Sequence, residues 1–201
     1  MKNKNHWYDG WFYDRFIAPN MDTLFGEIKN LIDENSSVID AGCGTGRLVL
    51  QLADKCKSVT GVDLSGRNIY KAKRNLEKFN SGNIKIIHGD VAEIKESRFD
   101  FSTMTFVIHE MAPSERIKVL RKLGEISDKI IIGDYITPQP VNLIGKMNVV
   151  IEFLAGRDHY NNYRHFISDG GIKSLAEQAG LKILDTINDK PVSAQIMVLE
   201  K

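Results

Sequence analysis

The sequence has little of what marks several large protein classes. Its 201 residues include two cysteines and five prolines, and the formal net charge at pH 7 is +1. Cys43 and Cys56 are too few for a disulfide framework, and neither has the C-x-x-C spacing of a metal site. Proteins that bind phosphate backbones usually carry a basic surplus or patch, which is missing here. We therefore expect no nucleic-acid partner and no metal site.

Long apolar runs are also missing. The N-terminal residues, MKNKNHWYDG, have no apolar stretch after their lysines and do not form a secretory signal. The longest apolar stretch, around 147–155, is interrupted by Glu152 and is shorter than the roughly 20 residues that span a bilayer. We therefore expect a cytoplasmic protein with no membrane span and with reduced cysteines.

What is present is a hydrophobic fraction of 42%, enough for a sizeable core in a chain of one-domain length. Strand-like runs alternate with helical patterns as far as Tyr135, which indicates a parallel sheet with helices on both faces. The expected strands cover 37–40, 58–62, 84–87, 99–106 and 129–133. The expected helices cover 21–32, 47–54, 66–79 and 113–126.

After Tyr135 the alternation breaks. An apolar helix is expected over 141–155, with Leu143, Ile144, Met147, Val150, Ile151 and Leu154 on its apolar side. It is interpreted as core, and the alternative is the wall of an apolar pocket. A polar, aromatic segment follows over 157–166. A helix over 171–179 ends at Gly180, a residue suited to a helix C-terminus. The last two runs, 181–187 and 194–199, predict two strands that pair as an antiparallel edge.

The expected fold is therefore α/β, a Rossmann-like three-layer sandwich. Its mostly parallel seven-stranded sheet has an antiparallel edge strand. We expect a single domain over 1–201, with an N-terminal aromatic helical segment (1–32) and a lid-like insertion (136–170).

The strongest motif is a strand that runs directly into spaced glycines and a helix, Val38-Ile-Asp-Ala-Gly-Cys-Gly-Thr-Gly46. Bare backbone of this kind lets a ligand approach closely. The glycines fall as G-x-G-x-G, whereas the dinucleotide fingerprint is G-x-G-x-x-G, and Leu48 stands near its third glycine position.

Three successive strands each end in an acid, namely Asp40, Asp63 and Asp90. A single aspartate at such a place is usually a helix cap or a turn residue. Together with the glycines, the three acids predict a ligand site at the carboxyl ends of the strands. Asp63 can accept from ribose hydroxyls, Leu64 can pack on a base, and Asp90 can accept from an amine of the base. The acids suit a cation better than a pyrophosphate.

These segments resemble the class I S-adenosylmethionine (SAM) dependent methyltransferases, of the broad type that includes the ubiquinone and menaquinone enzymes. The resemblance covers 38–48, 59–65, 88–90 and, more loosely, 99–111. It implies SAM as the cofactor, and it implies these cofactor contacts: Asp40, Gly42 and Gly44 beside the methionine part, Asp63 on the ribose, Asp90 and Val91 on the adenine, and Met104 on the sulfonium side. Cys43, Gly46 and Leu64 belong to the same motifs and complete the predicted cofactor site.

The catalytic and substrate residues are less readable, because methyl transfer mainly needs positioning and exclusion of water. His109 is a candidate base or acceptor-orienting residue, or it packs beneath the cofactor or caps a helix; Glu110 is interpreted as a solvated residue at a helix start. The candidate substrate residues are Tyr13, His159, Tyr160, Tyr163 and Arg164. The alternative is that 157–166 is an amphipathic helix packed on the domain.

The main hypothesis is a methyltransferase acting on a small-molecule acceptor. The D/N-P-P-Y/F run of enzymes that methylate nucleic-acid amino groups is absent, and His109-Glu110-Met111-Ala112 stands in its place. A nicotinamide oxidoreductase is the second hypothesis, but the Tyr-x-x-x-Lys pair of the short-chain enzymes is missing. A module that binds SAM without catalysis is the third. The acceptor and the oligomeric state stay open.

Overall fold

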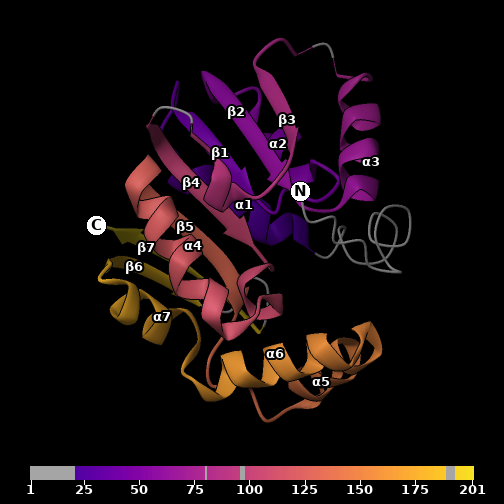
Figure 1. Ribbon diagram of the computed structural model, residues 1–201, viewed down its shortest axis with the longest axis vertical. Helices are drawn as coiled ribbons and strands as arrows, with labels where there is room; N and C mark the ends of the chain where they lie inside the picture. The colour runs from indigo at the N-terminus through magenta and orange to yellow at the C-terminus, as the bar shows by residue number, and fades with distance from the viewer. Residues whose placement is uncertain (1–20, 80, 96–97, 189–192) are drawn as a thin grey trace.

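The computed structural model describes residues 21–79, 81–95, 98–188 and 193–201. In these residues seven strands form one sheet (Figure 1), with the order β3-β2-β1-β4-β5-β7-β6. The strands are β1 (Ser37–Ala41), β2 (Ser58–Asp63), β3 (Ile84–His88), β4 (Phe99–Thr105), β5 (Ser127–Tyr135), β6 (Lys182–Asn188) and β7 (Ala194–Glu200). The helices are α1 (Asp22–Leu31), α2 (Arg47–Leu52), α3 (Gly66–Leu76), α4 (Pro113–Ile126), α5 (Leu143–Ala155), α6 (Arg157–Ser168) and α7 (Gly171–Ala179), with the short 3-10 helices η3 (Val91–Glu93) and η4 (Ile108–Glu110).

The sheet confirms the predicted fold class. Strands β1 to β5 pair in parallel, and β7 runs antiparallel to both β5 and β6, so the antiparallel pairing lies at one edge of the sheet. From β1 the chain proceeds outward to β3 and then returns to the other side of β1 as β4. In open α/β sheets this reversal of strand order leaves a crevice at the carboxyl ends of the two central strands, where ligands bind.

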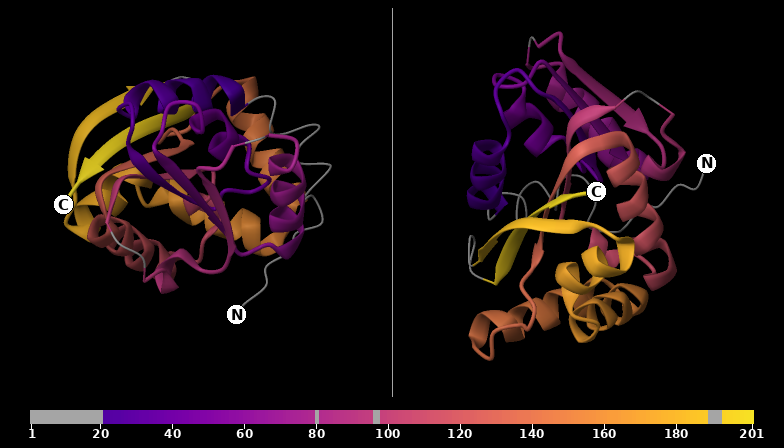
Figure 2. Two further views of the ribbon diagram at one scale, coloured as in Figure 1. Left: turned by 90° about the horizontal axis from the view of Figure 1, so that it is seen from above. Right: turned by 90° about the vertical axis from the view of Figure 1, so that its left-hand side faces the viewer.

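Helices cover both faces of the sheet (Figure 2), as side chains alternate along each strand. Ile131 of β5 belongs to a core shared with α1, α2 and α3, whereas its neighbours Ile130 and Ile132 belong to a core shared with α4, α6 and α7. On the first of these faces, the lack of a side chain at Gly133 lets α1 pack closely on β5. A Cβ at Gly133 would lie 2.9 Å from Leu24 of α1. The two cores make the three layers expected of this sandwich.

Most predicted elements are found with ends shifted by one to three residues. The helix predicted over 113–126 matches α4, which has Pro113 in its first turn. The prediction that Gly180 ends the following helix is also right, since this glycine has a left-handed backbone at the C-cap of α7. Of the N-terminal aromatic helical segment predicted over 1–32, residues 1–20 lie outside the described residues.

The interpretation of the apolar helix as core is wrong. Helix α5 buries only Gly145, Asn148 and Glu152, while the apolar residues that suggested a core face, Leu143, Ile144, Met147, Val150, Ile151 and Leu154, are exposed. The buried stripe is polar because Asn148 donates hydrogen bonds to Gln139 and Ser193. Helices α5 and α6 lie together at one end of the molecule, beyond the sheet (Figures 1 and 2). In the described residues, no helix has the length and apolar character needed to cross a bilayer.

Candidate active site

The glycine-rich turn between β1 and α2 has the backbone shape that only glycine adopts easily. Gly42, Gly44 and Gly46 have φ angles of +77°, +55° and +81°. A Cβ at Gly42 would also lie 2.4 Å from Cγ2 of Val107, which follows β4. The N–H groups of Gly42 and Cys43 both donate to the carbonyl of Val62, over 2.7 and 3.0 Å. The turn is thus held tightly against the carboxyl end of β2.

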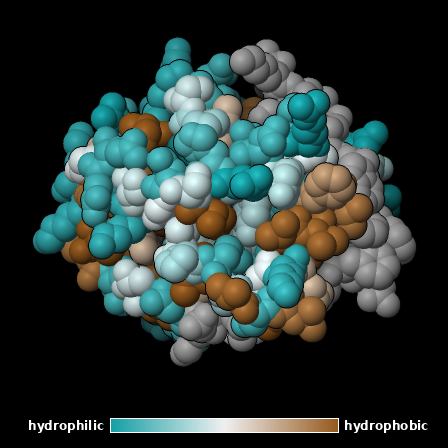
Figure 3. Space-filling view, turned by 90° about the horizontal axis from the view of Figure 1, so that it is seen from below, coloured by the Kyte–Doolittle hydropathy of each residue, from teal (hydrophilic) through white to brown (hydrophobic). Residues whose placement is uncertain are grey.

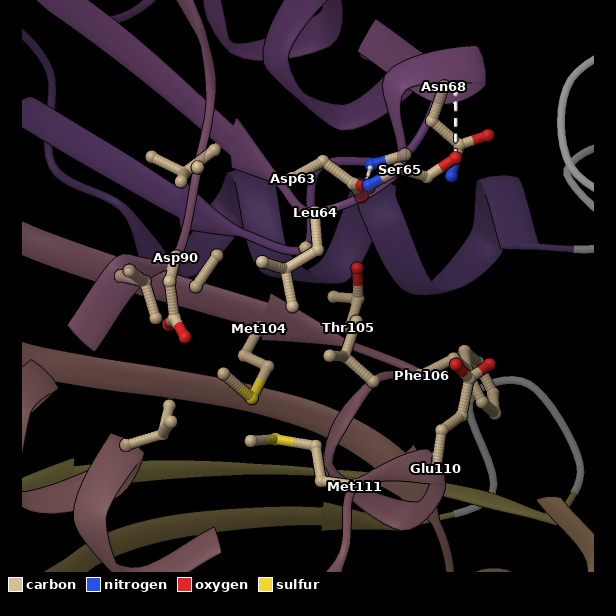
Figure 4. Close-up of a pocket in the computed structure, with 18 residues that line it drawn as sticks. Asp63, Leu64, Ser65, Asn68, Asp90, Met104, Thr105, Phe106, Glu110 and Met111 are labelled. Atoms are coloured by element: carbon tan, nitrogen blue, oxygen red, sulfur yellow. Dashed lines mark hydrogen bonds between the residues drawn. The ribbon is translucent and has the colours of Figure 1, made fainter. Parts of the chain in front are cut away.

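Asp63, at the end of β2, joins two turns with its two carboxylate oxygens. Its Oδ2 accepts a hydrogen bond from the N–H of Gly44 over 2.8 Å, and its Oδ1 accepts from the N–H of Ser65 over 2.7 Å. A carboxylate has about four acceptor sites, and the hydroxyl groups of a ribose are donors that such sites accept. Asp63 also lines a cavity at this edge of the sheet (Figure 4).

The cavity, of about 160 Å³, lies at the carboxyl ends of β1, β2 and β4. Its charged lining residues in the described part of the chain are all acidic, namely Asp63, Asp90 and Glu110. Leu64 and Met104 lie between these carboxylates in Figure 4, and Met111 lies below Met104. The remaining lining residues are Ala41, Gly42, Gly44, Val62, Ser65, Asn68, Gly89, Val91, Thr105, Phe106, Val107 and Val119.

Asp90 fits both sequence interpretations at once. Its Oδ1 accepts from the N–H of Ala92 over 2.9 Å, so it caps η3, yet the residue also lines the cavity. The adjacent Val91 is buried and forms part of the same wall. A cap leaves the second carboxylate oxygen available for an amine.

Asp40, Cys43 and Gly46 belong to the predicted cofactor set but do not line the cavity. Asp40 is buried beneath the glycine turn, where Thr103 donates a hydrogen bond to it over 2.7 Å. Burial, with the nearby charge of Asp63, raises the pKa of Asp40 to about 7 despite that bond. Cys43 is a buried free thiol that lies toward Gly61 of β2.

The cavity fits SAM in charge and in shape. An all-acidic set of charged groups suits a ligand with sulfonium and ammonium charges and would repel a dinucleotide's pyrophosphate. The two bare glycines, Gly42 and Gly44, give the close backbone approach, and the apolar Leu64, Val91 and Met104 can enclose an adenine. The residues predicted for the ribose and the adenine thus meet in one place.

His109, the candidate base, lies in a buried network instead of in the cavity wall. Its Nδ1 is 2.7 Å from Oδ1 of Asp134, at the end of β5, and its Nε2 is 3.5 Å from Oε1 of Glu152 in α5. Tyr135 donates its hydroxyl to the same Glu152 over 2.8 Å. Burial alone would lower the pKa of His109, but the charges of Asp134 and Glu152 raise it well above the ordinary value. His109 is therefore held as an imidazolium between two carboxylates.

The network reaches the cavity through His159 of α6. The ring nitrogens of His159 lie 3.2 Å from Glu152 and 3.3 Å from Glu110. Burial lowers the pKa of His159, but the hydrogen bonds and charges of Glu110 and Glu152 outweigh it and raise the pKa to about 9. Among the residues of this network, Glu110 also lines the cavity, and its side chain is 30% exposed. The interpretation of Glu110 as a simply solvated residue is thus wrong.

The other predicted substrate residues are placed less directly. Tyr163 is buried against Tyr135, and its hydroxyl has no hydrogen-bond partner within the described part of the chain. Tyr160 and Arg164 stack on one another at 5.8 Å, away from the cavity lining. Phe166 is also buried, so helix α6 is amphipathic and packs on the domain as the alternative interpretation has it. Tyr13 lies outside the described residues.

Three buried side chains of this network also have the spacing of a metal site. Donor atoms of His109, Glu152 and His159 all lie within 4.8 Å of one another. Each of these residues, however, already has an oppositely charged partner in the network. Charge balance among the side chains themselves therefore accounts for the cluster.

Sequence reasoning missed the roles of Asp134, Tyr135 and Glu152, which lie well beyond His109 in the chain. The available signal was Glu152 itself, a single acid in an otherwise apolar helix. A buried acid needs a partner, which points to a histidine or a tyrosine elsewhere in the chain. Arg116 was missed as well; it is buried and donates to the carbonyls of His109 and Asn162, which joins α4 to η4 and α6.

Comparison with known proteins finds methyltransferases. The family described as Methyltransferase domain matches residues 38–127. The probable cobalt-precorrin-6B C(15)-methyltransferase (decarboxylating) of Methanobrevibacter smithii is 41% identical over 61 residues, which are 30% of this chain and 33% of that protein. The protein of the same description from Methanocaldococcus jannaschii is 29% identical over 137 residues, 68% of this chain and 69% of that protein. The matched segment thus spans about a third of the first relative's length.

Solved structures share the fold over nearly the whole chain. Magnesium protoporphyrin IX methyltransferase (ChlM) from Synechocystis PCC 6803, with bound SAH, aligns with a TM-score of 0.66 and 18% identity. The alignment covers 96% of this chain and 90% of that chain. RNA methyltransferases also occur among the relatives by sequence.

The fold is Rossmann-like, and its glycine-edged cavity has the acidic lining that suits SAM as a cofactor. Residues 38–127 match the methyltransferase domain family, and the relatives found by sequence and by fold are methyltransferases. The nicotinamide oxidoreductase hypothesis is accordingly dropped. The finer resemblance to ubiquinone and menaquinone enzymes is not confirmed by these relatives.

Proposed function

We propose that this protein transfers the methyl group of SAM to a small-molecule acceptor that reaches the cofactor beside Glu110. The observation that carries the proposal is the position of Glu110, which lines the cavity and pairs with His159 of α6. The contact with His159 thus fixes the Glu110 carboxylate on the side of the cavity that faces α5 and α6. An acceptor would enter on this side, between these helices and the sheet.

When bound, SAM supplies an electrophilic methyl group on a sulfonium sulfur. Asp63 holds the ribose side, and the glycine turn fits against the methionine part. Glu110 would orient an acceptor hydroxyl or amine and accept the proton that the acceptor loses on methylation. His109 is buried away from the cavity, so we assign it a positioning role through Asp134 and Glu152.

Several observations support a small acceptor. The formal net charge is only +1, and the cavity's charged groups are acidic, which disfavours a polyanion at the methyl group. The relatives named for cobalt-precorrin and magnesium protoporphyrin IX have small-molecule names. The RNA methyltransferases among the relatives make RNA the natural comparison in any assay.

The experiment is to measure release of S-adenosylhomocysteine with a panel of hydroxyl, amine, thiol and carbon acceptors, with total RNA as a parallel arm. We expect release with one small-molecule class and none with RNA. The variant Glu110→Gln should lower kcat, whereas Glu115→Gln, at an exposed acid paired with Lys118, should leave kcat unchanged. Release with RNA alone would contradict the proposal, and tight SAM binding with no release from any acceptor would favour a non-catalytic module.

A further inference from the structure

Helix α5 presents an apolar face to solvent. Nine apolar side chains in and just before the helix are between 38% and 100% exposed: Val141, Leu143, Ile144, Met147, Val149, Val150, Ile151, Phe153 and Leu154. At this exposure they present on the order of 800 Å² of apolar surface, more than the ~300–600 Å² of the largest patch on a typical monomer. Figure 3 views this end of the molecule and shows brown apolar areas bordered by hydrophilic side chains.

Helix α5 has the opposite arrangement from an ordinary surface helix, since its polar side is buried and its apolar side faces solvent. Its buried positions, Gly145, Asn148 and Glu152, are spaced by three and four residues and form one narrow stripe. Two of these residues are tied to the body of the protein by polar contacts, Asn148 with Ser193 and Glu152 with Tyr135. Rotating the helix to bury its apolar side would break these contacts, so the outward apolar face is held by the structure.

Cations surround this face. The exposed ionisable groups of the segment 141–168 are the cations Lys146, Arg157 and Arg164, with His165, against one acid, Asp158. The acidic Glu152 is buried in its histidine network. Arg164 is linked to the apolar face through two aromatic rings. Its guanidinium lies over the ring of Tyr160, and the centroid of that ring is 5.6 Å from the centroid of the Phe153 ring. An apolar surface with a basic border is complementary to an anionic lipid surface.

We propose that α5 docks this protein peripherally on an anionic lipid bilayer, with its apolar face among the acyl chains and Lys146, Arg157 and Arg164 among the headgroups. The inference rests on the surface alone and does not depend on the proposed acceptor. A second copy of the chain fits this face less well, because a two-fold pairing through α5 sets the same three cations of each copy near those of the other. At 13 residues, α5 lies along the bilayer surface instead of crossing it.

Vesicle flotation tests this docking. Wild-type protein should float with phosphatidylcholine vesicles that contain phosphatidylglycerol, float less with pure phosphatidylcholine, and be partly released by high salt. Phe153→Ser should weaken partitioning about tenfold. Phe79→Ser is the matched control, because Phe79 is 54% exposed against 63% for Phe153 but lies just after α3, far from α5. Phe79→Ser should partition like the wild type.

Three companion measurements make the outcome decisive. Thermal unfolding and SAM binding should be the same for both variants, which shows that neither change damages the fold. Light scattering should give a monomer for the wild type. The proposal is overturned if the wild type does not float, if the two variants lose partitioning equally, or if a wild-type dimer that Phe153→Ser dissociates is found without vesicle binding.

Discussion

The backbone N–H of Gly44 donates a hydrogen bond to Oδ2 of Asp63 over 2.8 Å. This bond joins the two sequence motifs that carry the cofactor assignment, because Gly44 lies in the turn after β1 and Asp63 ends β2. The carboxylate is thereby fixed in position before any ligand binds. The backbone of the glycine turn orients the Asp63 carboxylate and is also the surface that a ligand must approach. The shape of the turn and the position of the carboxylate charge are therefore set together.

Replacing Asp63 by alanine should weaken SAM binding by roughly 10- to 100-fold, because hydrogen bonds to a charged group contribute about 1.5–3 kcal/mol each. Calorimetric titration of the variant with S-adenosylhomocysteine measures the loss. Asp54→Ala removes an exposed acid paired with Lys29 and should leave binding unchanged. An unaltered dissociation constant for Asp63→Ala would refute the ribose assignment.

Gly42→Ala should destabilise the protein and abolish SAM binding. The φ of +77° costs a residue with a Cβ about 1–2 kcal/mol, and the contact of 2.4 Å with Val107 forces a further shift. Gly89→Ala is the matched control in the same cavity, since a Cβ there lies 3.8 Å from Ile87, an ordinary contact. Thermal unfolding of both variants checks the difference, and equal melting temperatures would speak against the turn's proposed rigidity.

Asp40 should make the ligand-free protein less stable as the pH rises. Because burial raises the pKa of Asp40 to about 7 from 3.8, the folded state holds a proton that the unfolded state has lost between about pH 4 and pH 7. Asp40→Asn keeps an acceptor for Thr103 and has no charge to bury. We expect the variant to gain on the wild type as the pH rises from about 4 to about 7, so that its advantage in melting temperature is larger at about pH 8 than at about pH 5. The same difference in melting temperature at both pH values would show that Asp40 does not titrate in this way.

The network around Glu152 should contribute stability that is lost in alkaline solution. The pKa of His159 is raised to about 9, so its contribution is complete below about pH 6.5 and disappears as the pH rises through 9. Glu152→Gln leaves two buried imidazoles without their shared carboxylate and should cost about 3 kcal/mol near neutral pH. It should also flatten the fall in stability between about pH 7 and pH 9, a range above the titration of Asp40. Chemical denaturation across this range, with Glu115→Gln as control, measures both effects; an unchanged slope would contradict the network's charge state.

Metal removal should change nothing. Because each donor of His109, Glu152 and His159 already has an oppositely charged partner, we expect purified protein to contain less than one equivalent of metal. Dialysis against EDTA should then leave the melting temperature and SAM binding as they were. A stoichiometric metal in the purified protein, lost with Glu152→Gln, would mean that the cluster is a metal centre after all.

The sheet and the cofactor motifs were readable from the sequence because their signals are local. A strand, a glycine turn and an acid follow one another within a few residues at Asp40, Asp63 and Asp90, and parallel strands bring their carboxyl ends to one edge. The residues that wall the cavity from β4 and η4, such as Phe106 and Met111, have no such local signal, since only the packing of the sheet brings them there.

Helix α5 could not be placed by its apolar pattern. Which side of a helix is buried depends on the groups that each side contacts. The polar partners of Asn148 and Glu152 lie on β5, on α6 and beside β7, at separations of 17, 7 and 45 residues, outside the helix itself. The sequence could not decide between the catalytic and the packing interpretation of His109 for the same reason, because Asp134 and Glu152 are 25 and 43 residues away in sequence. Long-range pairing of charges is what a single sequence shows least.

The most direct test of the central claim is a calorimetric titration of the purified protein with S-adenosylhomocysteine, with NADH titrated in parallel. The all-acidic charged lining beside Asp63 and the bare glycine turn predict one saturable site for the nucleoside and no heat with NADH. Binding of NADH alone, or no heat with either compound, would contradict the assignment of this cavity to SAM.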